Sequence, residues 1–464
     1  VLDFNSKNDT VQVLHISSSL VFQKDTLNLH IHPDNLILNN KQWGIPENNN
    51  IVIAESYTDF QNIKLSRNFQ KLEISTKVPK METDHIGILF ENFQLQTFLS
   101  FLNPDEALAK GKVEGSFVIL KPYGASGLVA DIDIKDFQIM SNPFGTLTLD
   151  ASSKSLSEYD FDLALKDGAA NLTLTGDYSA KETSAELNME LDIQKLEASI
   201  IQGFAKDQLT DAKGYIDGSL LLKGTLSEPK YSGRLNFNDF GLSLSSYKTA
   251  GIINNQAIDI NQDEITLDSF KIDDVNQGTL TLDGRIITKN ILNPGFDLTI
   301  KTDKFRVLDS KKGDDELVYG IASIRANLIV GGNLEMPVIN GKLRVRDITD
   351  LTYLVPQDQL DIQERDGVVI FVNRENPDAI LTRNDGEASN SFFAGMDINT
   401  TLEIANEATF TIVLDEKTQD KLQASGEAIL NLNIDPNQDI RLSGRLELNS
   451  GFYRTSLYNL VSRE

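Results

Sequence analysis

The chain has 464 residues, of which 40% are hydrophobic and 24% are charged, so it holds enough apolar material for a folded core. It contains no cysteine, which excludes disulfides, thiolate nucleophiles and zinc–thiolate sites. The formal net charge of −25 argues against nucleic-acid binding, because such a surface repels phosphates. No segment approaches the 18 consecutive apolar residues of a membrane-spanning helix.

Residues 1–110 predict the latter part of a β-repeat. Val1 opens within a strand-like pattern and is not an initiating Met, so we expect the sequence to be a piece of a longer protein. A short helix is expected near residues 94–103 and should end before Pro104. Its apolar face would hold Phe98, Leu99, Phe101 and Leu102.

Residues 111–213 predict a second β-repeat. Polar and apolar residues alternate along 171–178 and along 186–193. This period of two is typical of half-buried antiparallel strands with one apolar face. A second short helix is expected near residues 195–205, with an apolar face of Leu196, Ile200, Ile201 and Phe204.

Residues 214–319 and 320–425 predict two further β-repeats, and 426–464 predict the start of a final, truncated one. In the third copy, only the short segment Phe305-Arg-Val-Leu308 stands where the earlier copies have a helix, so we expect that helix to be shortened or lost. A charged stretch in the fourth copy predicts a strand at 368–372 followed by a mobile loop.

A pair of glycines with a proline between them marks each of the four copies. The second glycines recur at intervals of 106, 108 and 103 residues and are Gly127, Gly233, Gly341 and Gly444. The first glycines are Gly111, Gly214, Gly320 and Gly426, and the prolines are Pro122, Pro229, Pro337 and Pro436. We expect the second glycines to occupy equivalent turns or strand starts, and each repeat to contact mainly its neighbours.

This pattern resembles the C-terminal repeat region of the TamB family, within the AsmA-like group. The resemblance extends along essentially the whole chain and is carried best by 214–240, 320–348 and 426–453. TamB is the inner-membrane-anchored subunit of the translocation and assembly module. The Asn- and Asp-rich strands resemble Bacteroidetes versions. The family's anchor helix and its last strands are expected outside this sequence.

The resemblance implies an all-β fold, an elongated, repeat-built curled β-sheet forming a half-pipe or β-taco groove with a few short helices. It implies a periplasmic protein of the bacterial cell envelope that conducts phospholipids between the inner and outer membranes and is linked to outer-membrane biogenesis. The implied partners are phospholipid acyl chains and the outer-membrane β-barrel partner of the translocation and assembly module. No cofactor is implied.

An apolar groove would solve a physical problem, because exposing an acyl chain to water costs about 0.8 kcal/mol per CH₂. Strands with a period of two supply such a groove if their apolar faces curl inward. The predicted lipid-groove residues are Leu172, Leu174, Leu235, Phe237, Ile265, Leu267, Leu280, Leu282, Leu343, Val345, Leu430, Leu432, Leu446 and Leu448. Their polar neighbours should face water, as exemplified by Arg234, Asn236, Thr281 and Arg344.

Two other functions fit the pattern. One is a scaffold for assembly of outer-membrane proteins, in which sheet edges template client strands. The other is a closed β-solenoid adhesin with a dry core. We do not expect an enzyme, since no Gly-x-Ser-x-Gly elbow occurs. We expect no metal either: His30 and His32 lie two apart on a strand, but a third ligand is not identifiable.

Overall fold

The structure is a computed structural model of the chain. It describes all residues except 9–10, 101–107, 125–126, 154, 156, 181–184, 206–207, 226–228, 246–247, 291, 314–316, 356–394, 417, 437–439, 458–460 and 464. Strands account for 74% of the structure and helices for 3%, which confirms the all-β prediction. The chain divides into two compact units, one of residues 1–205 with 215–236 and the other of 206–214 with 237–464.

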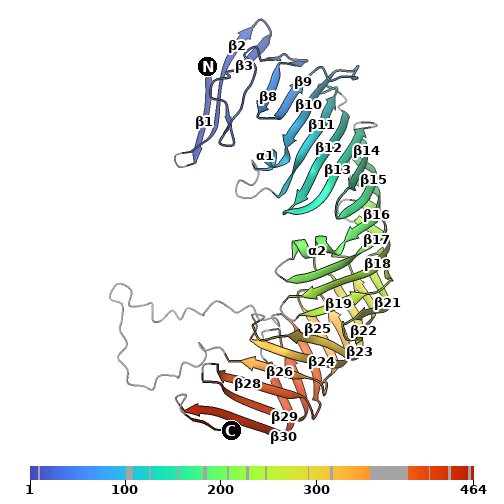
Figure 1. Ribbon diagram of the computed structural model, residues 1–464. Coiled ribbons are helices and arrows are strands. Elements are labelled where there is room, and N and C mark those ends of the chain that lie inside the picture. Colours follow the sequence, from blue (N-terminus) through green and yellow to red (C-terminus); the bar gives the residue numbers. More distant parts are fainter. Residues whose placement is uncertain are drawn as a thin grey trace. The chain divides into compact units, whose positions relative to one another are not determined.

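Unit 1 opens with a seven-stranded sheet in the order β5-β4-β2-β3-β6-β7, and β1 pairs with β2 (Figure 1). Its strands are β1 (Leu2–Asn8), β2 (Val11–Gln23), β3 (Thr26–Ile31), β4 (Ile37–Leu38), β5 (Lys41–Gln42), β6 (Asn50–Ile53) and β7 (Thr58–Gln61). The pairs are antiparallel, as alternating polar and apolar residues predict.

The second sheet begins with antiparallel neighbours in chain order. Its strands in unit 1 are β8 (Ile63–Arg67), β9 (Gln70–Ser75), β10 (His85–Gln94), β11 (Ala109–Leu120), β12 (Gly127–Ile139), β13 (Asn142–Ser153), β14 (Glu158–Lys166), β15 (Ala170–Ala180) and β16 (Ala185–Glu197). The unit division falls within β17 (Leu209–Thr225) and β18 (Pro229–Leu244). The two helices are α1 (Leu95–Leu99) and α2 (Ala198–Phe204), both inside the predicted segments.

Unit 2 holds β19 (Thr249–Ile253), β20 (Gln256–Gln262), β21 (Glu264–Asp273), β22 (Thr279–Ile287), β23 (Gly295–Ser310), β24 (Val318–Gly332), β25 (Pro337–Val345), β26 (Asp350–Leu354), β27 (Asp397–Ile404), β28 (Thr409–Asp415), β29 (Asp420–Ile434), β30 (Ile440–Leu457) and β31 (Val461–Arg463). The segment 305–308 lies in β23, so the third copy has no helix there, as predicted. The strand predicted at 368–372 and the loop after it lie outside the described residues.

Two strand pairs in unit 2 depart from the antiparallel pairing that the alternation favours. There β25 pairs with β27, and β26 pairs with β28, in parallel. Parallel neighbours need a long connection, and the chain between β26 and β27 supplies one.

Strands β8 to β30 belong to a large curled sheet of 23 strands that does not close into a barrel. At some places in the sheet, one long strand pairs with two shorter strands that follow each other in the chain. In unit 2, β18 pairs with β19 and β20, and β24 pairs with β25 and β26. These extra pairings lie within neighbouring strands and do not join the two ends of the sheet.

Bulges bend the long strands in the middle. The register shifts between Phe90 and Phe93 in β10 and between Thr302 and Phe305 in β23. Near such shifts Asn92 and Asp136 adopt positive φ values of 50° and 53°, which Asn and Asp tolerate better than most residues. A β-bulge bends its strand and increases the local twist. Register shifts also occur in β11, β12 and β21, so bulges bend several strands of the sheet.

The repeated glycines lie on hairpins. The pairs of strands that carry them are β11–β12, β17–β18, β24–β25 and β29–β30. Gly127 is the first residue of β12, as expected, but Gly233, Gly341 and Gly444 are each the fifth residue of a strand. A Cβ on these three would lie only 2.0, 2.2 and 2.3 Å from a carbonyl oxygen of the preceding strand. Three of the four positions are therefore equivalent, although inside strands. The repeat boundaries stay a prediction.

Candidate functional site: the apolar face of the sheet

Rows of apolar side chains cross the sheet in unit 2. Residues directly opposite each other on paired strands project from the same face. The register puts one row across six strands, made of Leu280, Thr302, Ala326, Leu343, Leu402 and Leu430. The next row contains Leu282, Ile300, Leu328, Gly341, Thr400 and Leu432. Predicted groove residues more than 100 positions apart in sequence thus share one face.

A third row ends at the last strand of the sheet. It contains Ile324, Val345, Ile404, Ala428 and Leu446. Leu446 and, two residues on, Leu448 are 54% and 64% exposed. They are exposed because β30 pairs on its far side only with β31, over three residues, among the described strands. The predicted groove thus ends at an uncovered strand.

The centre of the apolar face in unit 2 is a compact cluster. Leu267, Phe270 and Leu298 are buried there, at 8%, 6% and 9% exposure. The predicted Phe237 and Leu282 pack against this cluster. The Phe237 ring lies edge-on to Phe270, with ring centroids 5.6 Å apart. A further predicted residue, Ile265, is half-buried two positions before Leu267 on β21. The structure therefore brings these six predicted or cluster residues onto one face.

Unit 1 has equivalent rows. Leu172 lies in the row Phe93, Val113, Ile134, Leu147, Leu165, Leu172 and Ile193. Leu174 lies in the row Ile132, Leu149, Leu163, Leu174, Leu191 and Leu220. Leu235, the remaining predicted residue, is half-buried on β18. Of the polar neighbours, Arg234 and Arg344 are exposed, whereas Asn236 and Thr281 are half-buried.

The apolar face of unit 1 is covered at two places. Trp43, only 4% exposed, packs with Leu36 and Ile45 against Phe93, with the two ring centroids 6.1 Å apart. Helix α2 covers the second place through Ile200, in a cluster of Phe137, Phe144, Leu165 and Ala170. The sequence signal for the first contact is the short apolar segment Trp43-Gly-Ile45, whose residues do not alternate over the full length of a strand.

The three apolar rows of unit 2 contain almost no polar side chains. Their only polar side chains are Thr302 and Thr400, and Thr302 Oγ1 donates a hydrogen bond to the Thr279 carbonyl at 2.7 Å. Elsewhere, the hydrogen bond from Lys195 lowers the pKa of the Glu197 carboxyl, at the start of α2. Within the described residues no group of three or more His, Cys, Asp or Glu is placed to hold a metal ion. The face is suited to contact with apolar matter.

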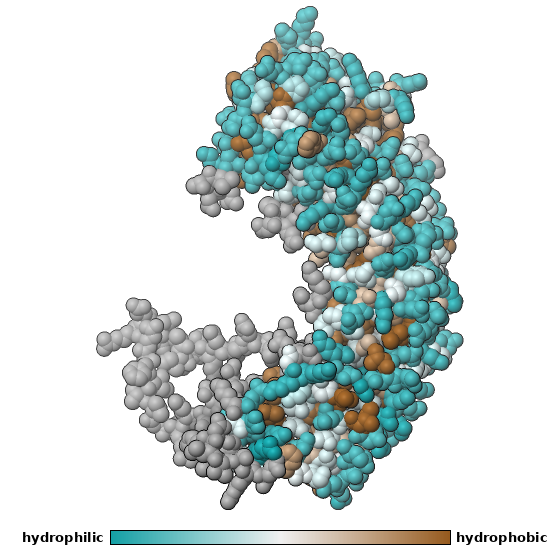
Figure 2. Space-filling view, in the orientation of Figure 1, coloured by the Kyte–Doolittle hydropathy of each residue, from teal (hydrophilic) through white to brown (hydrophobic). Residues whose placement is uncertain are grey.

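The side of the molecule shown in Figure 2 is mainly hydrophilic, with hydrophobic residues scattered among polar ones. This agrees with strands whose alternate side chains point into water. Among the helices of the described residues, none combines the length and the apolar character needed to cross a membrane.

These features define a class: all-β proteins with an open, curled sheet that presents rows of apolar side chains on one face. Residues 268–461 match the family model of the TamB C-terminal domain, which identifies this part of the chain as TamB-family. The TamB family has a role in biogenesis of the cell envelope. No curated protein and no solved structure matches the chain significantly. The likeness to Bacteroidetes versions stays a prediction.

Proposed function

We propose that the chain conducts phospholipids between the inner and outer membranes along its apolar face, without catalysing a reaction. The observation that supports this is the row from Leu280 to Leu430, which crosses six strands. At about 4.8 Å per strand spacing, that row is about 24 Å long. Seating ten CH₂ groups of an acyl chain on it would remove a cost of about 8 kcal/mol.

The partial exposure of the rows favours an open groove over a closed core. Leu282 and Leu343 remain half-buried although each has apolar neighbours on both adjoining strands. A closed solenoid would bury such residues completely, because protein interiors are close-packed. A lipid chain needs the opposite: apolar side chains that it can reach from outside.

The proposal includes a place and partners. The protein would lie in the periplasm, be held at the inner membrane by a part outside this sequence, and meet an outer-membrane β-barrel. One feature favours the scaffold function as a second candidate. Strand β30 has an open edge for most of its length among the described strands, and an open edge can accept a further strand by β-augmentation.

Lipid extraction and mass spectrometry of the purified chain test the conduit. We expect co-purified phospholipid with the wild type and at least about tenfold less with Leu282→Asp, since a charge on the apolar face must keep its water. The matched control is Thr281→Asp, one residue away on the opposite face, which should retain the lipid. Circular dichroism shows whether both variants fold.

A folded wild type free of lipid would refute the conduit. So would equal lipid loss in the two variants. Unfolding by Leu282→Asp together with a lipid-free wild type would favour a closed core, in which the new carboxylate would be buried without a partner. Strand-specific crosslinks from β30 to a client protein, in the absence of bound lipid, would favour the scaffold.

A further inference from the structure

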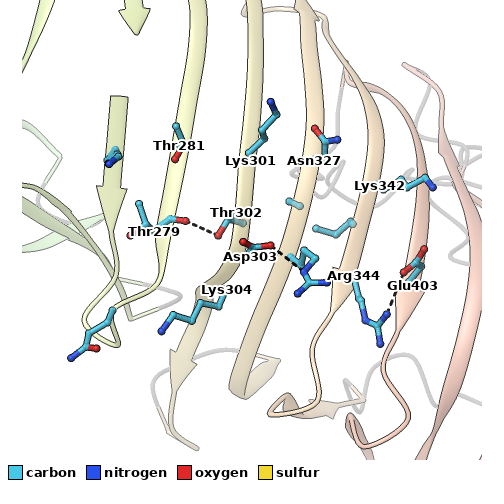
Figure 3. Close-up of a pocket in the computed structure, with 15 residues that line it drawn as sticks. Thr279, Thr281, Lys301, Thr302, Asp303, Lys304, Asn327, Lys342, Arg344 and Glu403 are labelled. Carbon is cyan, nitrogen blue, oxygen red and sulfur yellow. Dashed lines mark hydrogen bonds and ion pairs between the residues drawn. The ribbon is translucent and has the colours of Figure 1, made fainter. Parts of the chain in front are cut away.

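A row of polar side chains crosses unit 2 on the face opposite the apolar rows. The register aligns Lys271, Thr281, Lys301, Asn327, Lys342, Thr401, Asn431 and Ser443 on eight successive paired strands. Every member can donate a hydrogen bond, and none is apolar or acidic. Figure 3 shows Thr281, Lys301, Asn327 and Lys342 side by side on neighbouring strands. We call these eight residues the polar row.

The lysines of the polar row have no partners within the described residues. Arg325 and Arg344, in the adjoining row, are paired with carboxylates: Arg325 Nε lies 3.4 Å from Asp303 Oδ1, and Arg344 Nη1 lies 3.7 Å from Glu403 Oε2. By contrast, Lys271, Lys301 and Lys342 are exposed and make no side-chain hydrogen bond or ion pair there. Three unpaired cations in line are unusual on a chain with a net charge of −25.

Five residues of the polar row, from Lys271 to Lys342, border a hollow of about 740 Å³. Its lining includes six cationic side chains and two carboxylates, namely Lys271, Lys301, Lys304, Arg325, Lys342 and Arg344 with Asp303 and Glu403. The local charge is thus positive while the chain as a whole is strongly negative. Because charges farther away than about 8–10 Å are largely screened, a ligand seated in this hollow responds to the local charge.

We propose that the polar row binds an extended polysaccharide with an acidic group on every second sugar. The lysines occur on every second strand, β21, β23 and β25, and so lie about 9.6 Å apart. Two pyranose rings in an extended chain cover about the same length as these two strand spacings. The hydroxyl and amide side chains of Thr281 and Asn327, between the lysines, face the neutral sugars.

The spacing disfavours other anions. An extended acidic peptide repeats its side chains on one face every two residues, about 6.8 Å, which does not match the lysines. A flat anionic membrane would also have to approach the negative remainder of the chain. The next row on the same face, Thr299, Ile329, Asn340, Asn399 and Asn433, adds three adjacent asparagines that suit a hydroxyl-rich ligand.

Isothermal titration of the full 464-residue chain tests the proposal, with a hyaluronan octasaccharide as the probe, since it carries one carboxylate per disaccharide. We expect binding that weakens with added salt. The triple variant Lys271→Gln, Lys301→Gln and Lys342→Gln should lose at least about tenfold in affinity, because three charge-assisted contacts are removed. The control triple Lys166→Gln, Lys230→Gln and Lys289→Gln makes the same change in net charge at exposed positions elsewhere and should bind like the wild type.

Three comparison ligands decide between partners. A neutral chitin octasaccharide, a poly-aspartate peptide and vesicles of phosphatidylglycerol should each bind more weakly than the hyaluronan octasaccharide. The proposal is overturned if the wild type does not bind hyaluronan, if the two triple variants bind equally, or if the peptide or the vesicles bind more tightly. Lipid content, measured in the same samples, should be unchanged, because the polar row lies on the face opposite the apolar rows.

Discussion

Substituting Gly341 by alanine should open the β24–β25 pair. Gly341 has φ 142°, a conformation that side chains rarely adopt, and its Cβ would lie 2.2 Å from the Asn327 carbonyl oxygen. To bring this Cβ and the carbonyl oxygen to an ordinary van der Waals distance, the two strands must separate by about 1 Å. The backbone strain is about 1–3 kcal/mol, and each weakened ladder hydrogen bond adds about 1 kcal/mol. We expect a local loss of about 2–4 kcal/mol.

Native-state hydrogen exchange of the β24 and β25 amides measures this loss, because a chain of two units need not unfold in a single step. The matched control is Gly331→Ala, also on β24, where the nearest atom to the new Cβ is 4.0 Å away and φ is not positive. It should change the opening free energy by less than about 0.5 kcal/mol. Equal protection of these amides in the two variants would refute the close-approach argument.

Three further predictions concern polar groups. The Asp274 carboxylate accepts hydrogen bonds from the backbone amides of Asn276, Gly278 and Arg306, each at 2.7 Å. Asp274→Ala should lower the local stability by about 2–4 kcal/mol, which faster hydrogen exchange of the Arg306 amide would show. The buried Asn49 amide accepts a hydrogen bond from the Ile31 backbone N–H and donates one to the Ile31 carbonyl. Asn49→Leu should therefore destabilise the first sheet by about 2–3 kcal/mol in urea denaturation. An unchanged urea midpoint would contradict this structural role. The pKa of the Glu197 carboxyl lies below its ordinary value of 4.5, because Lys195 donates a hydrogen bond to it. The ionised carboxyl should therefore stabilise the protein above that pH, and this stabilisation should be lost as the pH falls through the lowered pKa. Between about pH 5 and about pH 3, the thermal midpoint of Glu197→Gln should fall less than that of the wild type.

Sequence analysis predicted the fold class and the composition of the apolar face because both follow from local alternation. A leucine two positions from another leucine on a strand shares its face whatever the partner strand is. Leu280 and Leu282 could therefore be assigned to one face from sequence alone. The short helices could be predicted for the same reason, since Ile200 and Phe204 repeat with helical spacing.

The register could not be predicted, because it depends on contacts between strands far apart in the chain. Only the structure shows that Leu280, Leu343 and Leu430 lie in one row, and that the lysines at 271, 301 and 342 lie in another. The parallel β25–β27 pair likewise depends on where a long connection returns.

The sequence by itself determined that this protein is a β-protein whose strands have one apolar and one polar face. The reason is that side-chain direction alternates along any strand. The tertiary structure decided which side chains become neighbours across strands, where bulges bend the sheet, and that Trp43 and α2 cover parts of the apolar face in unit 1. A shift in register by one residue would move every side chain of a strand to the other face, so only packing against both neighbouring strands fixes it.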